Sequence, residues 1–569
     1  MRAPCVLGVG LLAGTACAAP TANVKNGTYY GVHQSTWHQD YFQGIPYAQP
    51  PVGDLRFRDP QPLNTSWTGL KNATEMGYMC YGYGATQMVN GEYVSEDCLT
   101  LNVYRASNVS ANATSSSPKG LLPVVVYLHG GQFKQGSGRD PRYNMTSLLQ
   151  VGVQNAQPFV GVTLNYRLSY WGFLYGNDVA NANAANLGLK DQRLALRWVQ
   201  ENIAAFGGDP ERVTLWGMEA GAFSAGLQLL AYGGRDDHLF RGAIIESGSP
   251  MLMWPSVTAD EWDPLYHAIL NDTGCTDAGD SLACLRGVEA SALSSVFSGY
   301  SSDFTTLHRP NPVVDGDFLR DLGSQQLSSG QFVKVPILTG TTRDEGTWSD
   351  YGVKNINTTD EFEAVVEHDG LTSTASHKMA ALYPEDPDQG IPATLVGRPG
   401  NETGLGAQWK RVAAYSGDKV MIAGRRMAAQ TLANHGLDVY SYVYDVLFHA
   451  KWWQYGAQES DDLAFVFHNV TLSEAAISPT DAADQKPTFE PLSYLMCSMW
   501  LSFVSTLNPN NVPSAMKVNV TWPKYTTQSP QNLVFDVNAT ALCRTETDSY
   551  RSDAISYWMS LFTSSEYPR

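Results

Sequence analysis

The sequence lacks several features that would point to particular partners. After its first residues it has no apolar stretch near the roughly 20 residues that a membrane-spanning helix needs, so no transmembrane segment is expected. It has no basic stripe, and 37 Lys and Arg against 55 Asp and Glu give a net charge of -18, which disfavours nucleic acid and anionic membranes as partners. No internal repeat and no cysteine spacing typical of zinc are present.

What remains is the composition of a large globular protein. The chain has 569 residues, of which 43% are hydrophobic and 16% charged, enough for an extensive packed core. Arg2, the apolar residues 6–13 and the small residues 16–18 follow the order of a secretory signal peptide. We therefore expect a signal peptide over residues 1–19, a single domain over residues 20–569, and secretion.

Two further features fit an oxidising secretory pathway. Of eight cysteines, Cys5 and Cys17 leave with the signal peptide; Cys80 with Cys98 and Cys275 with Cys284 form short-range pairs, and Cys497 with Cys543 is left by elimination. Asn-X-Ser/Thr sequons also predict glycosylation at several sites. The twelve sequons begin at Asn26, Asn64, Asn72, Asn108, Asn112, Asn144, Asn271, Asn357, Asn401, Asn469, Asn519 and Asn538.

Short β-branched runs alternate with amphipathic stretches along the chain. This alternation predicts an α/β fold with a large, mostly parallel central sheet covered by helices on both faces, and a ligand site beyond the carboxyl ends of its strands. The expected strands are residues 124–128, 160–164, 213–216, 243–246, 335–338 and 439–444. The expected helices include residues 190–205, 220–231, 419–434, 492–506 and 554–562.

A series of motifs in fixed order carries a family resemblance. They are FQGIPYA at residues 42–48, PPVG at 50–53, SEDCL at 95–99, LNVY at 101–104, HGG at 129–131, NYRL at 165–168, NLGL at 186–189, FGGDP at 206–210, ESG at 246–248 and the segment 340–347. With them the chain resembles the type-B carboxylesterase family, which includes cholinesterases and fungal secreted lipases. The resemblance implies the α/β-hydrolase fold and the bridges Cys80–Cys98 and Cys275–Cys284. The short loop between the first two cysteines looks more like an esterase gate than a lipase flap.

The nucleophile position departs from the family pattern. A serine hydrolase of this fold carries its serine on a tight strand-to-helix turn with a glycine two residues to either side. The matching segment is GMEAG, residues 217–221, so Gly217 and Gly221 keep the turn while Glu219 takes the place of serine. Ser224 lies one helical turn further on, where a hydroxyl more often packs than reacts.

The base position departs as well. The family's histidine segment matches residues 456–467, where Glu459 stands in the place of histidine; His449 and His468 lie too far along the chain to replace it. Glu345 matches the family's acid. The resemblance therefore implies a site of three carboxylates, Glu219, Glu459 and Glu345.

The oxyanion hole is similar to that of the family in part. The backbone amides of Gly131, Gln132 and Ala220 can converge on an oxygen atom. Gln132 stands where the family usually has a third glycine. Its carboxamide either enters the pocket or points away.

Three carboxylates and no imidazole favour chemistry other than hydrolysis through an acyl-serine. Two carboxylates about 4 Å apart repel by roughly 4 kcal/mol at an effective dielectric of 20, so one keeps a proton and the pair supplies an acid beside a base. Such a site suits isomerisation, dehydration or cyclisation of a small apolar carbonyl compound, as in the tailoring of a natural product, and an acidic pH optimum would fit it.

Two alternatives stay open, and a residual ester hydrolase is a weaker third. One is a catalytically inactive member that serves binding or adhesion; the other is a cation site formed by the three carboxylates. Trp348, Trp452 and Trp453 suggest an apolar or aromatic ligand, although aromatic residues at such places commonly serve packing. The pattern calls for no cofactor and no resident metal, and it indicates no particular oligomeric state.

Overall fold

The structure is a computed structural model. It describes residues 19–88, 93–107, 120–301, 309–348, 354–400, 403–448, 450–470, 486–513, 520–538 and 541–569. The proposed signal peptide lies almost entirely outside the described residues. Within them, no helix is both long and apolar enough to cross a bilayer.

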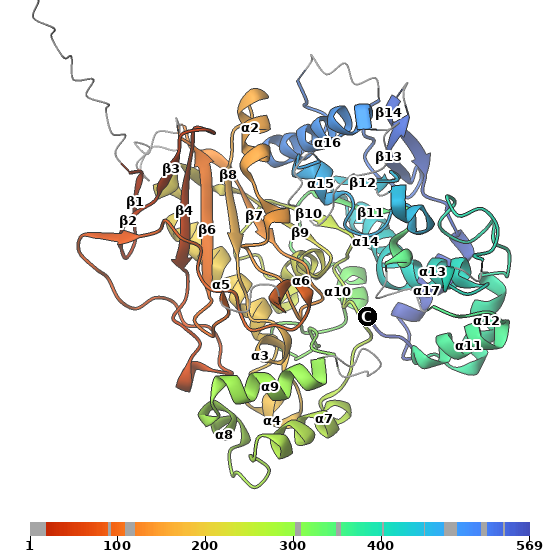
Figure 1. Cartoon of the computed structure of the whole chain (residues 1–569), viewed down its shortest axis with the longest axis horizontal. Helices are drawn as coiled ribbons and strands as arrows, with labels where there is room; N and C mark the ends of the chain where they lie inside the picture. Colours follow the sequence, from red (N-terminus) through yellow and green to blue (C-terminus); the bar gives the residue numbers. More distant parts are fainter. Residues whose placement is uncertain are drawn as a thin grey trace, which may run out of the picture.

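One large sheet organises the described chain (Figure 1). Eleven of the described strands form it in the order β14-β13-β12-β11-β10-β9-β7-β8-β6-β4-β3, with parallel pairing from β8 through β7 to β13 and antiparallel pairing at both edges. A small second sheet pairs β1, β2 and β5. The strands are β1 (Thr21–Val24), β2 (Gly27–Tyr30), β3 (Val32–Gln34), β4 (Gln39–Pro46), β5 (Leu70–Asn72), β6 (Thr100–Ala106), β7 (Leu122–Leu128), β8 (Val160–Leu164), β9 (Gly208–Met218), β10 (Gly242–Glu246), β11 (Ile337–Thr342), β12 (Val439–Tyr444), β13 (Gln531–Asn538) and β14 (Ala541–Thr547).

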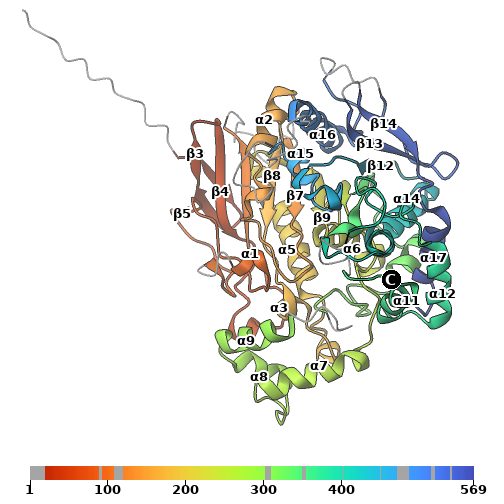
Figure 2. The same cartoon turned by 45° about the vertical axis from the view of Figure 1, so that its right-hand side comes forward.

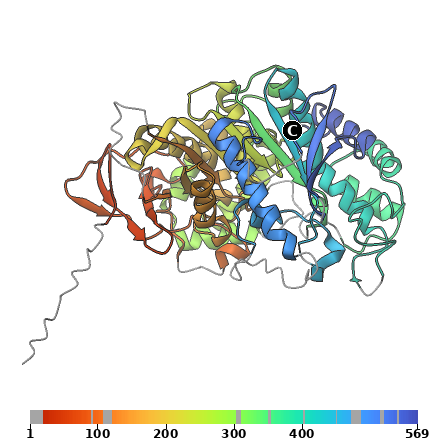
Figure 3. The same cartoon turned by 90° about the horizontal axis from the view of Figure 1, so that it is seen from above.

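Helices cover both faces of the sheet. Successive side chains of a strand point to opposite faces, and in β7 Val124 and Val126 join one hydrophobic core while Val125 and Tyr127 join another. The first core also holds α5 (Leu187–Asn202), α6 (Ala220–Gly234) and α14 (Ala423–Asn434), and the second holds α2 (Thr146–Gln154) and α16 (Lys486–Thr506). Figure 3 shows helices on both sides of the sheet. Figure 2 shows α7, α8 and α9 grouped away from the β13–β14 edge.

The helices are α1 (Ala85–Met88), α2 (Thr146–Gln154), α3 (Ser169–Phe173), α4 (Asn177–Asn181), α5 (Leu187–Asn202), α6 (Ala220–Gly234), α7 (Ala259–Asp272), α8 (Ser281–Gly287), α9 (Ala290–Ser301), α10 (Gly323–Ser328), α11 (Thr359–His368), α12 (Ser373–Leu382), α13 (Trp409–Gly417), α14 (Ala423–Asn434), α15 (Leu463–Val466), α16 (Lys486–Thr506) and α17 (Ser552–Phe562).

All six expected strands are present, and two of them, residues 160–164 and 439–444, match residue for residue. The strand expected at 335–338 begins and ends later, at Ile337–Thr342. The edge strands were not predicted, because buried and exposed residues that alternate, as in β1, form no continuous apolar run. The helix expected at 419–434 begins as an α-helix only at Ala423, after a π-helical turn.

One expected disulfide is wrong. Cys80–Cys98 and Cys275–Cys284 are both bonded, but Cys497 and Cys543 are free thiols. Both thiols are buried in the core that α16 shares with the sheet, where they pack as small apolar side chains. Elimination failed because a thiol that packs well in a core needs no partner. Burial raises the pKa of Cys543 to about 11 and that of Cys497 well above its usual range.

The sequons divide by exposure. Asn469 is only 5% exposed and its side-chain amide donates to the carbonyl oxygen of Asn144 at 3.3 Å, so glycosylation at Asn469 is not compatible with this conformation. Asn26 is half-buried. Asn108, Asn112, Asn401 and Asn519, and the side chain of Asn538, lie outside the described residues. The exposed sequon residues are Asn64, Asn72, Asn144, Asn271 and Asn357.

Candidate functional site

The turn between β9 and α6 carries Glu219 at its tip. Glu219 has φ 53° and ψ −121°, a conformation that side-chain-bearing residues rarely adopt. A Cβ on Gly217 would lie 2.1 Å from the carbonyl oxygen of Gly221, and a Cβ on Gly221 would lie 2.0 Å from that of Leu128. Only glycine therefore fits at both positions, and the tight turn expected from the spacing is formed.

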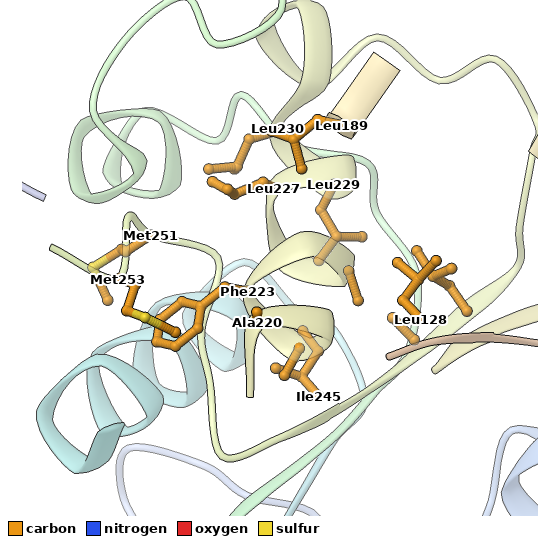
Figure 4. Close-up of a cluster of buried hydrophobic side chains, with 14 of the residues drawn as sticks. Leu128, Leu189, Ala220, Phe223, Leu227, Leu229, Leu230, Ile245, Met251 and Met253 are labelled. Carbon is orange, nitrogen blue, oxygen red and sulfur yellow. The ribbon is translucent and has the colours of Figure 1, made fainter. Parts of the chain in front are cut away.

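The helix that follows fixes this turn against the core. The side chains of Ala220, Phe223 and Leu227 on α6 are buried, together with Leu128 from β7 and Ile245 from β10 (Figure 4). A turn held by a packed helix and two central strands cannot shift easily. The position of the Glu219 backbone is therefore set by packing in the core.

The Glu219 side chain occupies the cradle expected to hold a substrate oxygen. Its Oε2 accepts hydrogen bonds from the backbone N–H of Gly131 at 2.6 Å and of Gln132 at 2.9 Å, and the N–H of Ala220 also interacts with the carboxylate. The amides of Gly131 and Gln132 thus converge on one oxygen, and that oxygen belongs to the protein. The backbone of Gln132 adopts φ 57° to present its amide.

Burial dominates the ionisation of Glu219. The residue is 4% exposed, and its Oε1 is buried without a hydrogen-bond partner in the described part of the chain. Burial raises the pKa of Glu219, while the amides of Gln132, Ala220 and Gly131 and the charge of Lys134 lower it; the net pKa is raised. Lys134 is itself buried. Sequence reasoning missed it, although a charged residue three positions after Gly131 in this buried loop was a signal.

Glu345 follows strand β11 and is fully buried. Its Oε1 accepts from the hydroxyl of Ser247 at 2.6 Å and from the amide of Thr342 at 2.8 Å. Burial raises the pKa of Glu345 to about 8, and the negative charge of Asp462 adds to this rise. Glu345 therefore holds a proton at neutral pH. The ESG motif contained the signal for Ser247, but no role was predicted for it.

Glu459 lies on a segment anchored to both of the other carboxylate-bearing turns. Ala457, two residues before it, hydrogen-bonds to Asp344, the neighbour of Glu345. Ser460, directly after it, contacts the sulfur of Met218, the neighbour of Glu219, at 3.7 Å. Glu459 is 3% exposed. The three glutamates predicted from the sequence thus come from segments that contact one another.

Two further buried acids, which the predicted site did not include, lie beside this group. The indole N–H of Trp500 donates to Glu246 at 2.5 Å, and the hydroxyl of Tyr442 donates to Asp462 at 2.8 Å. Burial raises the pKa of Glu246 well above its usual range and that of Asp462 to about 6. The surroundings of Glu345 are therefore acidic, and burial favours the protonated form of these acids.

The remaining expectations can be placed as follows. Ser224 is fully buried and accepts from the side-chain amide of Gln192 at 2.9 Å, so it packs as expected. His468 pairs with Glu490 at 3.2 Å, and His449 lies outside the described residues. In the described part of the chain, no three His, Cys, Asp or Glu side chains are placed to hold a metal ion, which gives the cation-site alternative no support.

The tryptophans give little support for an aromatic gorge. Trp348 is half-buried against the core, and Trp453 is 45% exposed. The side chain of Trp452 lies outside the described residues. Their role in ligand binding stays a prediction.

Comparisons with known proteins cover nearly the whole chain. Residues 18–558 match the model of the carboxylesterase family. The chain is 32% identical to a secreted triacylglycerol lipase of Gibberella zeae over 89% of its length and 85% of the lipase. It is also 32% identical to a secreted lipase of Botryotinia fuckeliana, over 89% of this chain and 88% of that protein.

The fold agrees with solved structures of esterases. The esterase EstA of Aspergillus niger superposes with a TM-score of 0.79 at 29% identity, covering 96% of this chain and 99% of that one. A PNB esterase superposes with a TM-score of 0.73 at 27% identity, covering 94% and 99%. The mostly parallel sheet with helices on both faces is therefore an α/β-hydrolase fold, and the chain belongs to the carboxylesterase family.

Proposed function

We propose that this protein moves protons on a small apolar carbonyl compound and does not hydrolyse esters through a serine. The observation that carries the proposal is the position of the Glu219 carboxyl group, whose Oε2 accepts hydrogen bonds from the backbone amides of Gly131 and Gln132. Isomerisation, dehydration and cyclisation all fall within this chemistry. The family match supports a small organic substrate.

In the proposed reaction, the cradle of amides serves the acid. Protonated Glu219 keeps Oε2 toward the amides and carries its proton on Oε1. When it gives that proton to the carbonyl oxygen of the substrate, negative charge develops on Glu219, where the amides and Lys134 stabilise it. The oxyanion hole would then stabilise negative charge on a side chain of the enzyme and not on the substrate.

A base must act at the same time. We assign this role to Glu459, which takes a proton from the carbon between the carbonyl and a neighbouring C=C bond, so that the substrate becomes a dienol. In the return step, Glu459 gives its proton to the far carbon of the dienol, the double bond shifts into conjugation, and the enol hydroxyl returns its proton to Glu219. Both residues end as they began. Glu345, protonated and held by Ser247 and Thr342, keeps a further negative charge out of the site.

The decisive experiment begins with the substrate. We would compare metabolites of strains with and without the protein, and then assay the purified protein on the compound that accumulates. Glu219→Gln, which can still accept from both amides but holds no transferable proton, and Glu459→Gln should each abolish product formation. The exposed Glu367→Gln is the matched control and should keep full activity. Full activity in either site variant would refute the proposal.

Serine-hydrolase chemistry is tested separately. A fluorophosphonate probe and short p-nitrophenyl esters should give neither labelling nor fast turnover, because Glu219 stands at the nucleophile position and Ser224 is buried. Strong labelling at any serine would overturn this part of the proposal.

A second candidate function is ligand binding without catalysis. The observation that favours it is that the amides of Gly131 and Gln132 are already satisfied by the protein itself. A pure binder should hold its ligand unchanged in the wild type, and Glu219→Gln should still bind it. Any turnover of that ligand that depends on Glu219 excludes this candidate.

We further propose that the protein is secreted as a single folded domain and acts outside the cell. The signal-peptide pattern of residues 1–19, the two disulfides and the secreted relatives support this location. Detection of the protein in culture medium, with its N-terminus near residue 20, would test it.

A further inference from the structure

Asp344 links the two segments that carry Glu345 and Glu459. Its backbone N–H donates to the carbonyl oxygen of Ala457 at 3.0 Å, and its side-chain Oδ2 accepts from the N–H of Ala457 at 2.9 Å. One aspartate therefore makes two hydrogen bonds with one residue of the facing segment. Asp344 directly precedes Glu345, and Ala457 lies two residues before Glu459.

Two neighbours show how closely these segments approach. A Cβ on Gly456 would lie 2.1 Å from Oδ2 of Asp344, and Gly456 has φ +65°. The hydroxyl of Thr347 lies 2.6 Å from the carbonyl oxygen of Tyr455. The contact thus extends over residues 344–347 on one side and 455–457 on the other.

Asp344 is 4% exposed and borders a cavity of about 510 Å³. Burial raises the pKa of Asp344 to about 7; the amide of Ala457 lowers it, the charge of Asp445 raises it, and Arg343 and Arg551 lower it. The titratable and charged groups that interact with Asp344 are Arg343, Lys410, Asp445, Tyr550 and Arg551.

We propose that Asp344 is a positioning residue that pins the segment of Glu459 to the turn of Glu345 through Ala457. Opening this contact would expose Asp344 to water and return its pKa to the usual range, so the contact should weaken as the pH rises and Asp344 ionises. The contact itself does not depend on catalysis. Its meaning for function rests on the proposed roles of Glu345 and Glu459.

Hydrogen–deuterium exchange of the peptide that covers residues 455–463 tests the pin without any substrate. In the wild type, protection of this peptide, corrected for intrinsic rates, should fall by more than roughly tenfold as the pH rises from 5.5 to 8, because buried Asp344 loses a proton that it holds more tightly than the open segment does. Asp344→Asn should retain the fold and remove this pH dependence. Asp344→Ala should raise exchange at every pH.

The exposed Asp388, which borders the same cavity, offers a matched control. Asp388→Asn should keep the exchange and pH profile of the wild type. Unchanged protection in Asp344→Ala, or a pH dependence that persists in Asp344→Asn, would overturn the proposal. If Asp344→Ala does not fold, the profile of Asp344→Asn decides alone. If the exchange results match these expectations but Glu219→Gln keeps full activity, the positioning role of Asp344 stands and only the proposed reaction is refuted.

Discussion

Raising the pH from 5 to 8.5 should destabilise this protein. The reason is a set of buried acids that are more basic in the folded chain than in the unfolded one. The pKa of Glu345 rises from 4.5 to about 8, and at about 1.36 kcal/mol for each tenfold change in proton affinity, ionising it costs about 5 kcal/mol. The pKa of Asp344 rises to about 7 and that of Asp462 to about 6.

The sign follows from proton binding. Between the pKa of the unfolded acid, about 4, and that of the folded acid, the folded chain holds more protons, so stability falls with rising pH. Three such groups give at most about 4 kcal/mol per pH unit near pH 5. Asp548 is paired with Arg425 and Arg426 and has a lowered pKa. Its contribution therefore makes stability rise with pH, but only in more acidic solution. Stability should therefore peak in acidic solution, below about pH 5.

Urea unfolding at a series of pH values measures this profile, and Glu345→Gln isolates one contribution. At pH 5 the variant should be less stable by about 1–3 kcal/mol, because its new N–H₂ occupies the place of an oxygen without a partner. Between pH 5 and pH 8.5 it should gain about 4 kcal/mol relative to wild type, since it has no charge to bury. The exposed Glu367→Gln should follow the wild type throughout. A difference between Glu345→Gln and wild type that stays constant with pH would refute the reasoning.

Three further predictions concern local features. Gly456→Ala should lower the free energy of unfolding by more than about 2 kcal/mol, because its Cβ would lie 2.1 Å from a carboxylate oxygen. In the control Gly436→Ala, where φ is +80° and the surrounding space is open, the loss should be about 1 kcal/mol. A maleimide should leave Cys497 and Cys543 unlabelled in the native protein and should label both once the protein is denatured without reductant. A disulfide between them would contradict the structure. Mass spectrometry of glycopeptides should find Asn469 unmodified, and its occupation would show that this segment folds differently.

The sequence predicted those parts of the site that depend on local spacing. The turn at Glu219 could be predicted because two glycines at fixed distances impose it. The rotamer of Glu219 could not, since it depends on amides 87 and 88 residues earlier in the chain. The missed contact of Asp344 with Ala457 has the same cause, because it spans 113 residues. Likewise, nothing local to Cys497 or Cys543 distinguishes a packed thiol from a bonded one.

The position of the Glu219 carboxyl group limits the chemistry that this fold can perform. In a serine esterase the cradle stabilises charge on the substrate, so it must be vacant when the substrate binds. Here the side chain at the tip of the turn reaches the same amides, and a substrate oxygen can enter only by displacing a carboxylate held at 2.6 and 2.9 Å. Proton transfer from Glu219 requires no displacement, because the charge it creates lies already within the cradle. The proposed acid catalysis by Glu219 therefore uses the geometry that is present.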